Sequence, residues 1–255
     1  MSEGLGLDRD RLLQIEDAAL NAWPAPRQMI LDGWLLRFAG GYTKRANSVN
    51  PRYPSSMSLI EKIAVCEHIY AAQGLPCLFR CPEPVSSPAL TDALTQAGFA
   101  GFEPTLTLGQ ALEIDRFQVV DGIRFMDSVD WIGLRAQLTC TPIAQWAMHR
   151  TILDCIVPEK ALVGLFVDQQ PVACGMAVLE GDLLGFFSIL TALNERRKGY
   201  GRMIMGALSA WGTARGAAFG YLQVEGDNDP ALAMYAQMGF KLCYPYVYYK
   251  KVIGE

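Results

Sequence analysis

One short pattern occurs twice in this sequence, and the repetition limits how the chain can be organised. Residues 88–99 and 230–240 both begin Pro-Ala-Leu, continue as an expected helix and end in Gly-Phe. Internal similarity of this kind is typical of a duplicated unit, although a short helix that ends in glycine is also common by chance. The 255 residues suit one large domain or two small ones, and the repetition favours two.

Composition narrows the class of protein. Hydrophobic residues make up 51% and charged residues 19%, which excludes a disordered chain and allows a full core. The net charge of -4 disfavours a general nucleic-acid binder. Seven cysteines without a CxxC pattern and only two histidines predict buried reduced thiols and no metal site. Without a signal peptide or a long apolar run, the chain is expected to be cytoplasmic, as a monomer or homodimer.

Hydrophobic periodicity predicts alternating helices and strands in both halves. In the first half, helices are expected at 12–23, 58–73 and 87–97, and strands at 29–38, 44–49, 77–81 and 105–108. In the second half, helices are expected at 128–138, 142–155, around 204–211 and at 229–238. The strands expected there are 162–167, 172–179, 183–190, 221–225 and 244–250.

The most informative segment is the basic turn 196–202, between an apolar strand and an amphipathic helix. Two glycines let the backbone curl so that free N–H groups at the helix start point to one centre. Together with four cationic side chains, these groups favour an anion such as a pyrophosphate, although a solvated basic turn remains the alternative. The spacing fits neither a P-loop nor a dinucleotide fingerprint. The anion-binding residues predicted here are Arg196, Arg197, Lys198, Gly199, Tyr200, Gly201 and Arg202.

Two motifs in order suggest a family. Residues 196–201 fit the pattern [QR]xxGxG, and residues 228–240 look like NxxAxxxYxxxGF. In this respect the chain resembles the GNAT superfamily of acyl-CoA-dependent N-acyltransferases, over about residues 113–251. The resemblance implies a mixed sheet that splays between its fourth strand (183–190) and its fifth (221–225), with acyl-CoA held in the gap.

The resemblance also implies roles for individual residues. The cofactor would lie along the fourth strand at Ile189, Leu190 and Thr191, where backbone groups pair with the pantetheine arm. Asn228 would cap the next helix and touch the cofactor, or would only cap the helix. Tyr235 would bind at the CoA sulfur and protonate the leaving thiolate, with an aromatic packed on a helix face as the alternative.

The general base is harder to identify. GNAT enzymes often place a glutamate on the fourth strand, but residues 183–190 contain no carboxylate. Glu225 at the end of the fifth strand is the nearest candidate, and a surface or loop-anchoring role is its alternative. Ser188 holding a water molecule, or a water chain with no dedicated base, are the other options.

The first half resembles a degenerate copy of the same unit. It has no RxxGxG, and alignment of the Gly-Phe ends places Leu94 opposite Tyr235. Residues 32–50 also look like the opening signature of tandem GNAT proteins. That segment is rich in recognition-type side chains, which bind an amino-acid-like acceptor or knit the two halves together. They are Trp34, Arg37, Arg45, Asn47 and Ser48.

The sequence therefore predicts an α/β protein of two GNAT-like domains, each with a mixed, largely antiparallel twisted sheet. Residues 1–112 would form a degenerate domain that walls the acceptor site, and residues 113–255 the catalytic domain. The predicted function is acetyl-CoA-dependent N-acetyl transfer to a primary amine of a small molecule or peptide, by direct attack. The alternative is a non-catalytic CoA-binding regulatory module. Partners in a membrane or in nucleic acid are not expected.

Overall fold

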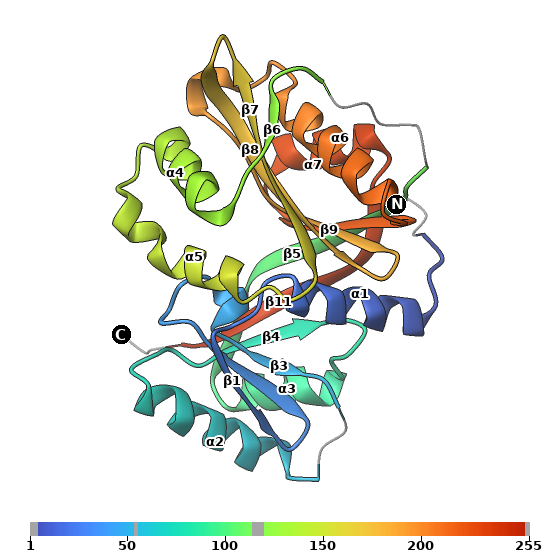
Figure 1. Ribbon diagram of the computed structural model, residues 1–255. Coiled ribbons are helices and arrows are strands. Elements are labelled where there is room, and N and C mark those ends of the chain that lie inside the picture. Colours follow the sequence, from blue (N-terminus) through green and yellow to red (C-terminus); the bar gives the residue numbers. More distant parts are fainter. Residues whose placement is uncertain (1–4, 54–55, 114–119, 253–255) are drawn as a thin grey trace.

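A single eleven-stranded sheet runs through the computed structural model, which describes residues 5–53, 56–113 and 120–252 (Figure 1). The strands are β1 (Arg27–Leu31), β2 (Trp34–Phe38), β3 (Val49–Pro51), β4 (Leu78–Pro82), β5 (Phe99–Ala111), β6 (Ile123–Phe125), β7 (Glu159–Val167), β8 (Gln170–Glu180), β9 (Leu183–Thr191), β10 (Phe219–Glu225) and β11 (Lys241–Lys251). The α-helices are α1 (Arg9–Asn21), α2 (Leu59–Ala72), α3 (Pro88–Gln96), α4 (Ser128–Thr139), α5 (Ala147–Asp154), α6 (Tyr200–Thr213) and α7 (Asp229–Met238). Short 3-10 helices occupy Lys44–Ala46, Ile143–Trp146 and Leu193–Glu195.

The two halves of the chain exchange their last strands. The order in the sheet is β1-β2-β3-β4-β11-β5-β10-β9-β8-β7-β6, so β5 of the first half lies between β10 and β11. In return, β11 of the second half lies between β4 and β5. At the centre of this exchange, Thr105 on β5 is paired with Glu225 on one side and Tyr246 on the other. The two expected sheets are thereby joined into one.

The sheet opens where the resemblance predicted. β9 and β10 pair in parallel, from Phe219 opposite Leu183 to Leu222 opposite Phe186. Beyond that point β9 continues to Thr191 and β10 to Glu225, without further pairs between them in the described residues. Because parallel strands that separate leave backbone groups unpaired, the opening is a natural place for a ligand to add its own hydrogen bonds.

Helices cover both faces of the sheet and form three cores (Figure 1). Residues of α1, α4 and α5 pack on one face, against β8, β9 and β10. The α6 and α7 helices pack on the opposite face of the same strands. In the first half, α2 and α3 cover one face of β2, β3 and β4. This arrangement is the mixed α/β fold that the sequence predicts.

A buried ion pair ties α1 to the junction of the two halves. Arg80 on β4 donates to the Glu16 carboxylate, and both side chains are 1% exposed. The Tyr244 hydroxyl on β11 donates to the same carboxylate at 2.7 Å. Burying charge is costly unless the charge is paired and hydrogen-bonded, and here the Glu16 carboxylate accepts from both Arg80 and Tyr244. The polar junction thereby holds together strands from both halves.

Four element predictions were inaccurate in their bounds. The expected strand 29–38 is the hairpin of β1 and β2, because Asp32-Gly33 forms a two-residue turn with positive φ at both residues. The expected strand 44–49 is a 3-10 turn followed by β3, and the expected helix 142–155 is a 3-10 turn followed by α5. The expected strand 105–108 is the much longer β5, because it is paired on both sides.

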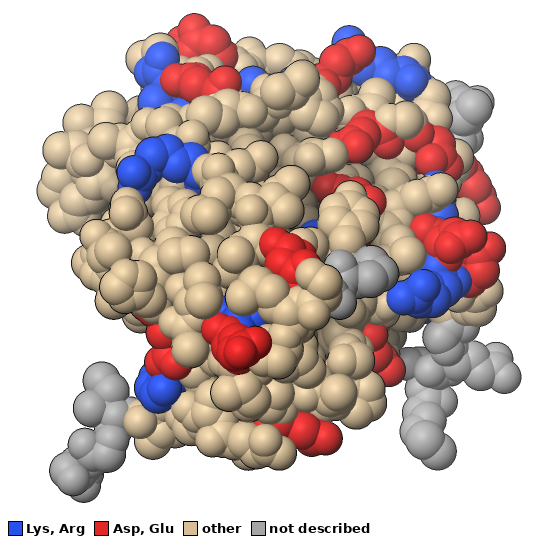
Figure 2. All heavy atoms as spheres, turned by 90° about the horizontal axis from the view of Figure 1, so that it is seen from below, with Lys and Arg blue, Asp and Glu red and all other residues tan. Residues whose placement is uncertain are grey.

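The outer surface carries mixed charge. Figure 2 shows lysine, arginine and acidic side chains in small groups among neutral residues on the lower face of Figure 1. No helix among the described residues has both the length and the apolar character needed to cross a bilayer.

Candidate active site

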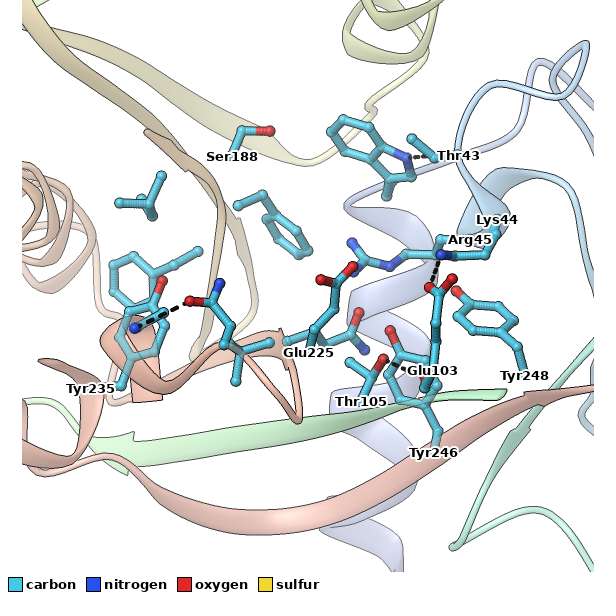
Figure 3. Close-up of a pocket in the computed structure, with 18 residues that line it drawn as sticks. Thr43, Lys44, Arg45, Glu103, Thr105, Ser188, Glu225, Tyr235, Tyr246 and Tyr248 are labelled. Atoms are coloured by element: carbon cyan, nitrogen blue, oxygen red, sulfur yellow. Dashed lines mark hydrogen bonds and ion pairs between the residues drawn. The ribbon is translucent and has the colours of Figure 1, made fainter. Parts of the chain in front are cut away.

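A cavity of about 520 Å³ lies at the opening between β9 and β10 (Figure 3). Its first wall, the C-terminal wall, is built from residues 186–189, 223–225, Asn228, Ala231 and Tyr235. Its second wall, the N-terminal wall, is built from Thr43, Lys44, Arg45, Glu103 and Thr105. Trp23 and the tyrosines Tyr246 and Tyr248 of β11 complete the lining. Both halves of the chain therefore contribute to one site.

The C-terminal wall contains a bulge in β9. Pairing with β8 shifts register between Cys174 and Met176, and Ser188 there adopts a φ of +55°. Nη1 of Arg135, on α4, donates to the carbonyl oxygen of Ser188 at 2.9 Å. A bulge redirects backbone groups out of the regular ladder, so this one turns part of β9 toward the cavity.

Aromatic rings hold Arg135 in place. Its guanidinium carbon lies 4.9 Å from the ring centroid of Trp146 and 5.2 Å from that of Trp131. Both contacts are in the range of cation–π interactions, which stabilise a partly buried arginine. The neighbouring His149 packs edge-on against Trp23 and shares a 2.8 Å hydrogen bond with the Tyr42 hydroxyl. Burial, together with the charge of Arg135, lowers the pKa of His149 to about 3, so this ring stays neutral.

Strained backbone is concentrated around the cavity. Eight non-glycine residues of the described chain have positive φ. Hairpin turns or a helix end explain four of them, namely Asp32, Cys140, Asp168 and Gln169. Three of the others, Thr43, Glu103 and Ser188, line the cavity, and the fourth, Arg197, lies in the basic turn. Such conformations persist only where the surroundings enforce them, and they cluster at functional sites.

Tyr235 faces the cavity from α7. Its side chain is 8% exposed and packs edge-on against Phe240 at 5.8 Å between ring centroids. Burial raises the pKa of the Tyr235 phenol to about 12, because the phenolate would lose its water. The hydroxyl is therefore protonated throughout the physiological range and can donate a proton.

Two carboxylates face the same space. Glu225 ends β10 on the C-terminal wall, and in Figure 3 it lies between Tyr235 and Arg45. Glu103 lies on the N-terminal wall, where it forms an ion pair with Lys44. Glu225 is exposed and so retains access to water.

The structure brings only one of the five predicted acceptor residues to the cavity, and that residue is Arg45. Trp34 is buried under Lys62, whose Nζ lies 4.1 Å from its ring centroid. Arg37 is 1% exposed and donates to the carbonyl oxygens of Leu20, Trp23 and Arg45.

The remaining two residues, Asn47 and Ser48, also make hydrogen bonds within the protein. The Asn47 amide bonds to the backbone of residues 39–43, with its oxygen accepting from the N–H groups of Ala39 and Gly41 at 2.8 and 2.9 Å. Ser48 is fully buried, and its carbonyl oxygen accepts from the Arg37 N–H and the Asn50 amide. All these partners lie in the first half of the chain, so the contacts stabilise that half and do not join the two halves.

The basic turn lies beyond the open end of β9. Gly199 is the N-cap of α6 with a φ of +85°, a conformation that glycine adopts without strain. A Cβ on Gly201 would lie 3.2 Å from Met234 Sδ, so the close approach of α6 to α7 favours glycine there. The first turn of α6 contains no acidic residue, so its N-terminal dipole is not neutralised from within.

The surrounding side chains leave this turn cationic. Lys198 pairs with Glu195 at 2.8 Å, and this hydrogen bond raises the pKa of the Lys198 amine. Arg202 donates to the Gln237 amide at 2.8 Å, while Arg196 and Arg197 are exposed. The geometry suits an anion at the start of α6.

Comparison with known proteins agrees with this geometry. Residues 131–240 match the family model described as Acetyltransferase (GNAT) family, and residues 11–100 match one described as Probable histone acetyltransferase Rv0428c C-terminal. The chain is 27% identical to the Uncharacterized N-acetyltransferase YobR of Bacillus subtilis over 239 residues, 91% of this chain and 95% of that protein. It is also 27% identical to the Probable histone acetyltransferase Rv0428c of Mycobacterium tuberculosis over 231 residues, 89% and 70% of the two chains.

Solved structures share the fold. A GCN5-related N-acetyltransferase from Kribbella flavida superposes with a TM-score of 0.69 at 14% identity, covering 95% of this chain and 96% of that one. A tandem GNAT protein from the clavulanic acid biosynthesis pathway gives a TM-score of 0.63 at 11% identity, covering 99% and 90%. Residues 131–240 form an acetyltransferase domain of the GNAT family. The likeness to the tandem protein extends over both halves of this chain and shows that the two proteins share a fold.

Within the GNAT domain, the predicted cofactor residues lie along one path. Ile189, Asn228 and Tyr235 line the cavity. Leu190 and Thr191 pair with Cys174 and Ala173 of β8, which places them between the bulge and the basic turn. The Asn228 side chain caps α7 by accepting from the Ala231 N–H at 3.3 Å.

Sequence reasoning missed several residues of the GNAT cavity. Glu103 and Lys44 come from different elements of the first half, and nothing in their local sequence indicates that they meet. Gln223 lies on the fifth strand, which was predicted to border the acyl-CoA gap, but no role was predicted for its side chain. Arg135 lies on α4, far from both motifs in sequence. A signal did exist for the turn before β2, where Asp-Gly is the usual hairpin dipeptide.

Proposed function

We propose that the protein transfers an acetyl group from acetyl-CoA to a primary amine of a small molecule or peptide, by direct attack within the cavity. The observation that carries this proposal is the placement of the buried Tyr235 and the β9 bulge around one opening, next to an anion-binding turn. Acetyl-CoA would supply an activated acetyl thioester. The amine nitrogen forms a bond to the carbonyl carbon, and the carbon–sulfur bond breaks.

The cofactor would bind along β9 and the start of α6. The backbone of Ile189, Leu190 and Thr191 would follow the pantetheine arm, and residues 196–202 would hold the pyrophosphate. The donor chemistry fits, because a helix start that lacks an acidic residue is surrounded there by exposed cations. Asn228 would keep its cap on α7 and lie beside the arm.

Tyr235 would act as the general acid. A thiolate leaves more easily when it receives a proton, and the raised pKa of Tyr235 keeps its hydroxyl protonated for this purpose. Backbone N–H groups near the Ser188 bulge would stabilise the negative charge that develops on the carbonyl oxygen.

Glu225 would remove the proton from the attacking amine. It is the carboxylate on the C-terminal wall, and its exposure lets the proton pass to water. Glu103 is less suited because its charge is taken up by Lys44. Residues 1–112 would form the degenerate domain that walls the acceptor side, and residues 113–255 the catalytic domain.

The test is Tyr235→Phe, assayed by release of free thiol from acetyl-CoA with a panel of amines. We expect kcat to fall by about 100-fold, the usual scale for losing a general acid, with an unchanged KM for acetyl-CoA. Tyr53→Phe, at an exposed tyrosine remote from the cavity, is the matched control. Equal kcat in the two variants would rule out the acid role.

Wild-type pH dependence gives a second readout. Because the pKa of Tyr235 is about 12, kcat should stay level on the alkaline side until the pH approaches that value. A fall centred near pH 10, the ordinary value of about 10 for tyrosine, would contradict this assignment. Acetyl-CoA binding with no turnover on any amine would instead indicate a non-catalytic module.

A further inference from the structure

The acceptor side of the cavity contains buried polar atoms without partners. Within the described residues, Nε of Arg45 and both amide atoms of Gln223 are buried and make no hydrogen bond. Arg45 and Gln223 both line the cavity, one from each half of the chain. A buried polar group without a partner is costly, and such groups are rare unless a ligand satisfies them.

The unpaired atoms indicate which chemical groups a ligand would need in order to pair with them. An arginine Nε and an amide nitrogen are both donors, and an amide oxygen is an acceptor. A carboxylate accepts from both donors at once, and a planar carboxylate is the group that the arginine fork matches best. An N–H of the same ligand would satisfy the amide oxygen of Gln223.

The charged side chains along the cavity are arranged to match a ligand with one positive and one negative end. The Lys44 charge is neutralised by Glu103, which leaves Arg45 as the cation of the N-terminal wall without a carboxylate partner in the described structure. The Arg45 guanidinium also lies 5.6 Å from the ring centroid of Phe187, on the C-terminal wall. Figure 3 shows Tyr235, Glu225 and Arg45 in succession across the cavity. A ligand that spans Glu225 and Arg45 meets a negative charge and then a positive one.

The floor beside Arg45 is polar as well. Tyr246 is 2% exposed and lines the cavity. Burial opposes ionisation of Tyr246, but the charges of Arg45 and Arg80 outweigh it and lower the pKa of this phenol. Its hydroxyl adds a further polar group beside Arg45. This end of the cavity is therefore not built for an apolar tail.

We propose that the acceptor is a free amino acid, whose carboxylate binds Arg45 and Gln223 while its amine lies at Glu225. This proposal rests on the proposed acetyl transfer and specifies its substrate. An amine with a second cationic group would place like charges together at Arg45. A simple alkylamine would leave Nε of Arg45 and the Gln223 amide unsatisfied, and sites with such groups reject ligands that lack the complement.

The first experiment compares three acceptor pools with the intact protein and acetyl-CoA. One pool contains the twenty proteinogenic L-amino acids, the second their carboxamides, and the third the matching decarboxylated amines. N-acetyl products are identified by mass. We expect kcat/KM for the best amino acid to exceed that of its carboxamide and of its decarboxylated amine by at least about 30-fold, the scale of a lost charged hydrogen bond.

Variants then assign the effect to residues. Arg45→Met should raise the KM of the best amino acid by about 30-fold, leave the KM of acetyl-CoA unchanged, and abolish the preference over the carboxamide. Arg45→Lys should restore part of this preference, and Gln223→Leu should weaken it. Arg150→Met is the matched control, because Arg150 lies on the surface and pairs with Asp154. Thermal unfolding of each variant checks that it is folded.

The outcomes distinguish a failure of the amino-acid proposal from a failure of the proposed acetyl transfer. Equal turnover of amino acids and their carboxamides, or an equal loss on both in Arg45→Met, overturns the amino-acid proposal while acetyl transfer stands. Turnover of the decarboxylated amines in preference to the amino acids also overturns it, since the site would then not select a carboxylate. Absence of any product in all three pools and with a lysine-containing peptide, with acetyl-CoA bound, overturns both.

Discussion

The two halves of this protein share the order of three strands, helix, strand, helix and strand, but they begin the first helix of that series, α2 or α6, differently. In the C-terminal half, α6 starts at Gly199 with no acidic residue in its first turn and with exposed cations around it. In the N-terminal half, α2 starts at Ser58, whose hydroxyl accepts from the Glu61 N–H at 3.3 Å and donates to its carboxylate at 2.7 Å. This cap satisfies one N–H of the helix start from within the helix, and Glu61 places a negative charge where an anion would bind.

The other parts of the site differ in the same way. β9 has nine residues and extends past β10, whereas its counterpart β3 has three and pairs with β4 in parallel only at Val49. At the position of Tyr235 the N-terminal half has Leu94, which is fully buried in its core. A short strand and a packed leucine leave no opening for a pantetheine arm.

The comparison shows which features a duplicated unit must keep. The N-terminal half retains its last strand, because β5 fills the place between β10 and β11 and supplies Glu103 and Thr105 to the cavity. The exchange of strands makes each half part of the other's sheet. The first half therefore completes the shared sheet although it has neither the basic turn nor a tyrosine at the position of Tyr235.

The largest effect is expected at the junction of the halves. Glu16→Ala leaves the Arg80 guanidinium buried without its partner, which should lower the free energy of unfolding by about 3–5 kcal/mol. Chemical denaturation followed by circular dichroism measures this. Glu67→Ala, which breaks a surface pair with Lys251, should cost less than about 1 kcal/mol. The double variant Glu16→Leu, Arg80→Met should recover most of the loss, and no recovery would contradict the account.

A smaller effect is expected from loosening the bulge that only the C-terminal half possesses. Arg135→Met removes the donor to the Ser188 carbonyl, and a misplaced β9 should lower kcat by roughly 10–100-fold. The KM of acetyl-CoA should change little, because the basic turn is untouched. Arg135→Lys should restore part of kcat. A parallel loss of thermal stability and kcat in both variants would show that Arg135 has only a packing role.

The smallest effect is expected from exchanging charges between the two helix starts. Arg202→Glu places in α6 the charge that Glu61 places in α2, and it should raise the KM of acetyl-CoA by about 10-fold at low salt. The effect should shrink as salt screens it. Glu61→Arg, the reverse change in the N-terminal half, should leave this KM unchanged. A similar rise in both variants would argue against a pyrophosphate at α6.

Much of the fold was predictable because its signals are local. The positions of α2, α3, α6 and α7 follow from apolar periodicity, caps and terminal glycines, all read within a few residues. The hairpin at Asp32 was missed because the flanking residues form one apolar run. β5 was predicted too short, since its length depends on partners far away in sequence.

By itself, the sequence indicated the repeated helix pattern of the two halves, the glycine-containing basic turn before α6 and the place of Tyr235, because each depends on residue types at fixed short spacings. Only the tertiary structure decided that the halves share one sheet, that Arg45 alone of five candidates reaches the cavity, and that Arg135 supports the bulge. Those outcomes depend on which side chains meet across long loops. Burial and unsatisfied donors or acceptors decide which of several chemically similar residues can bind a ligand. Neither property can be read from spacing in the sequence.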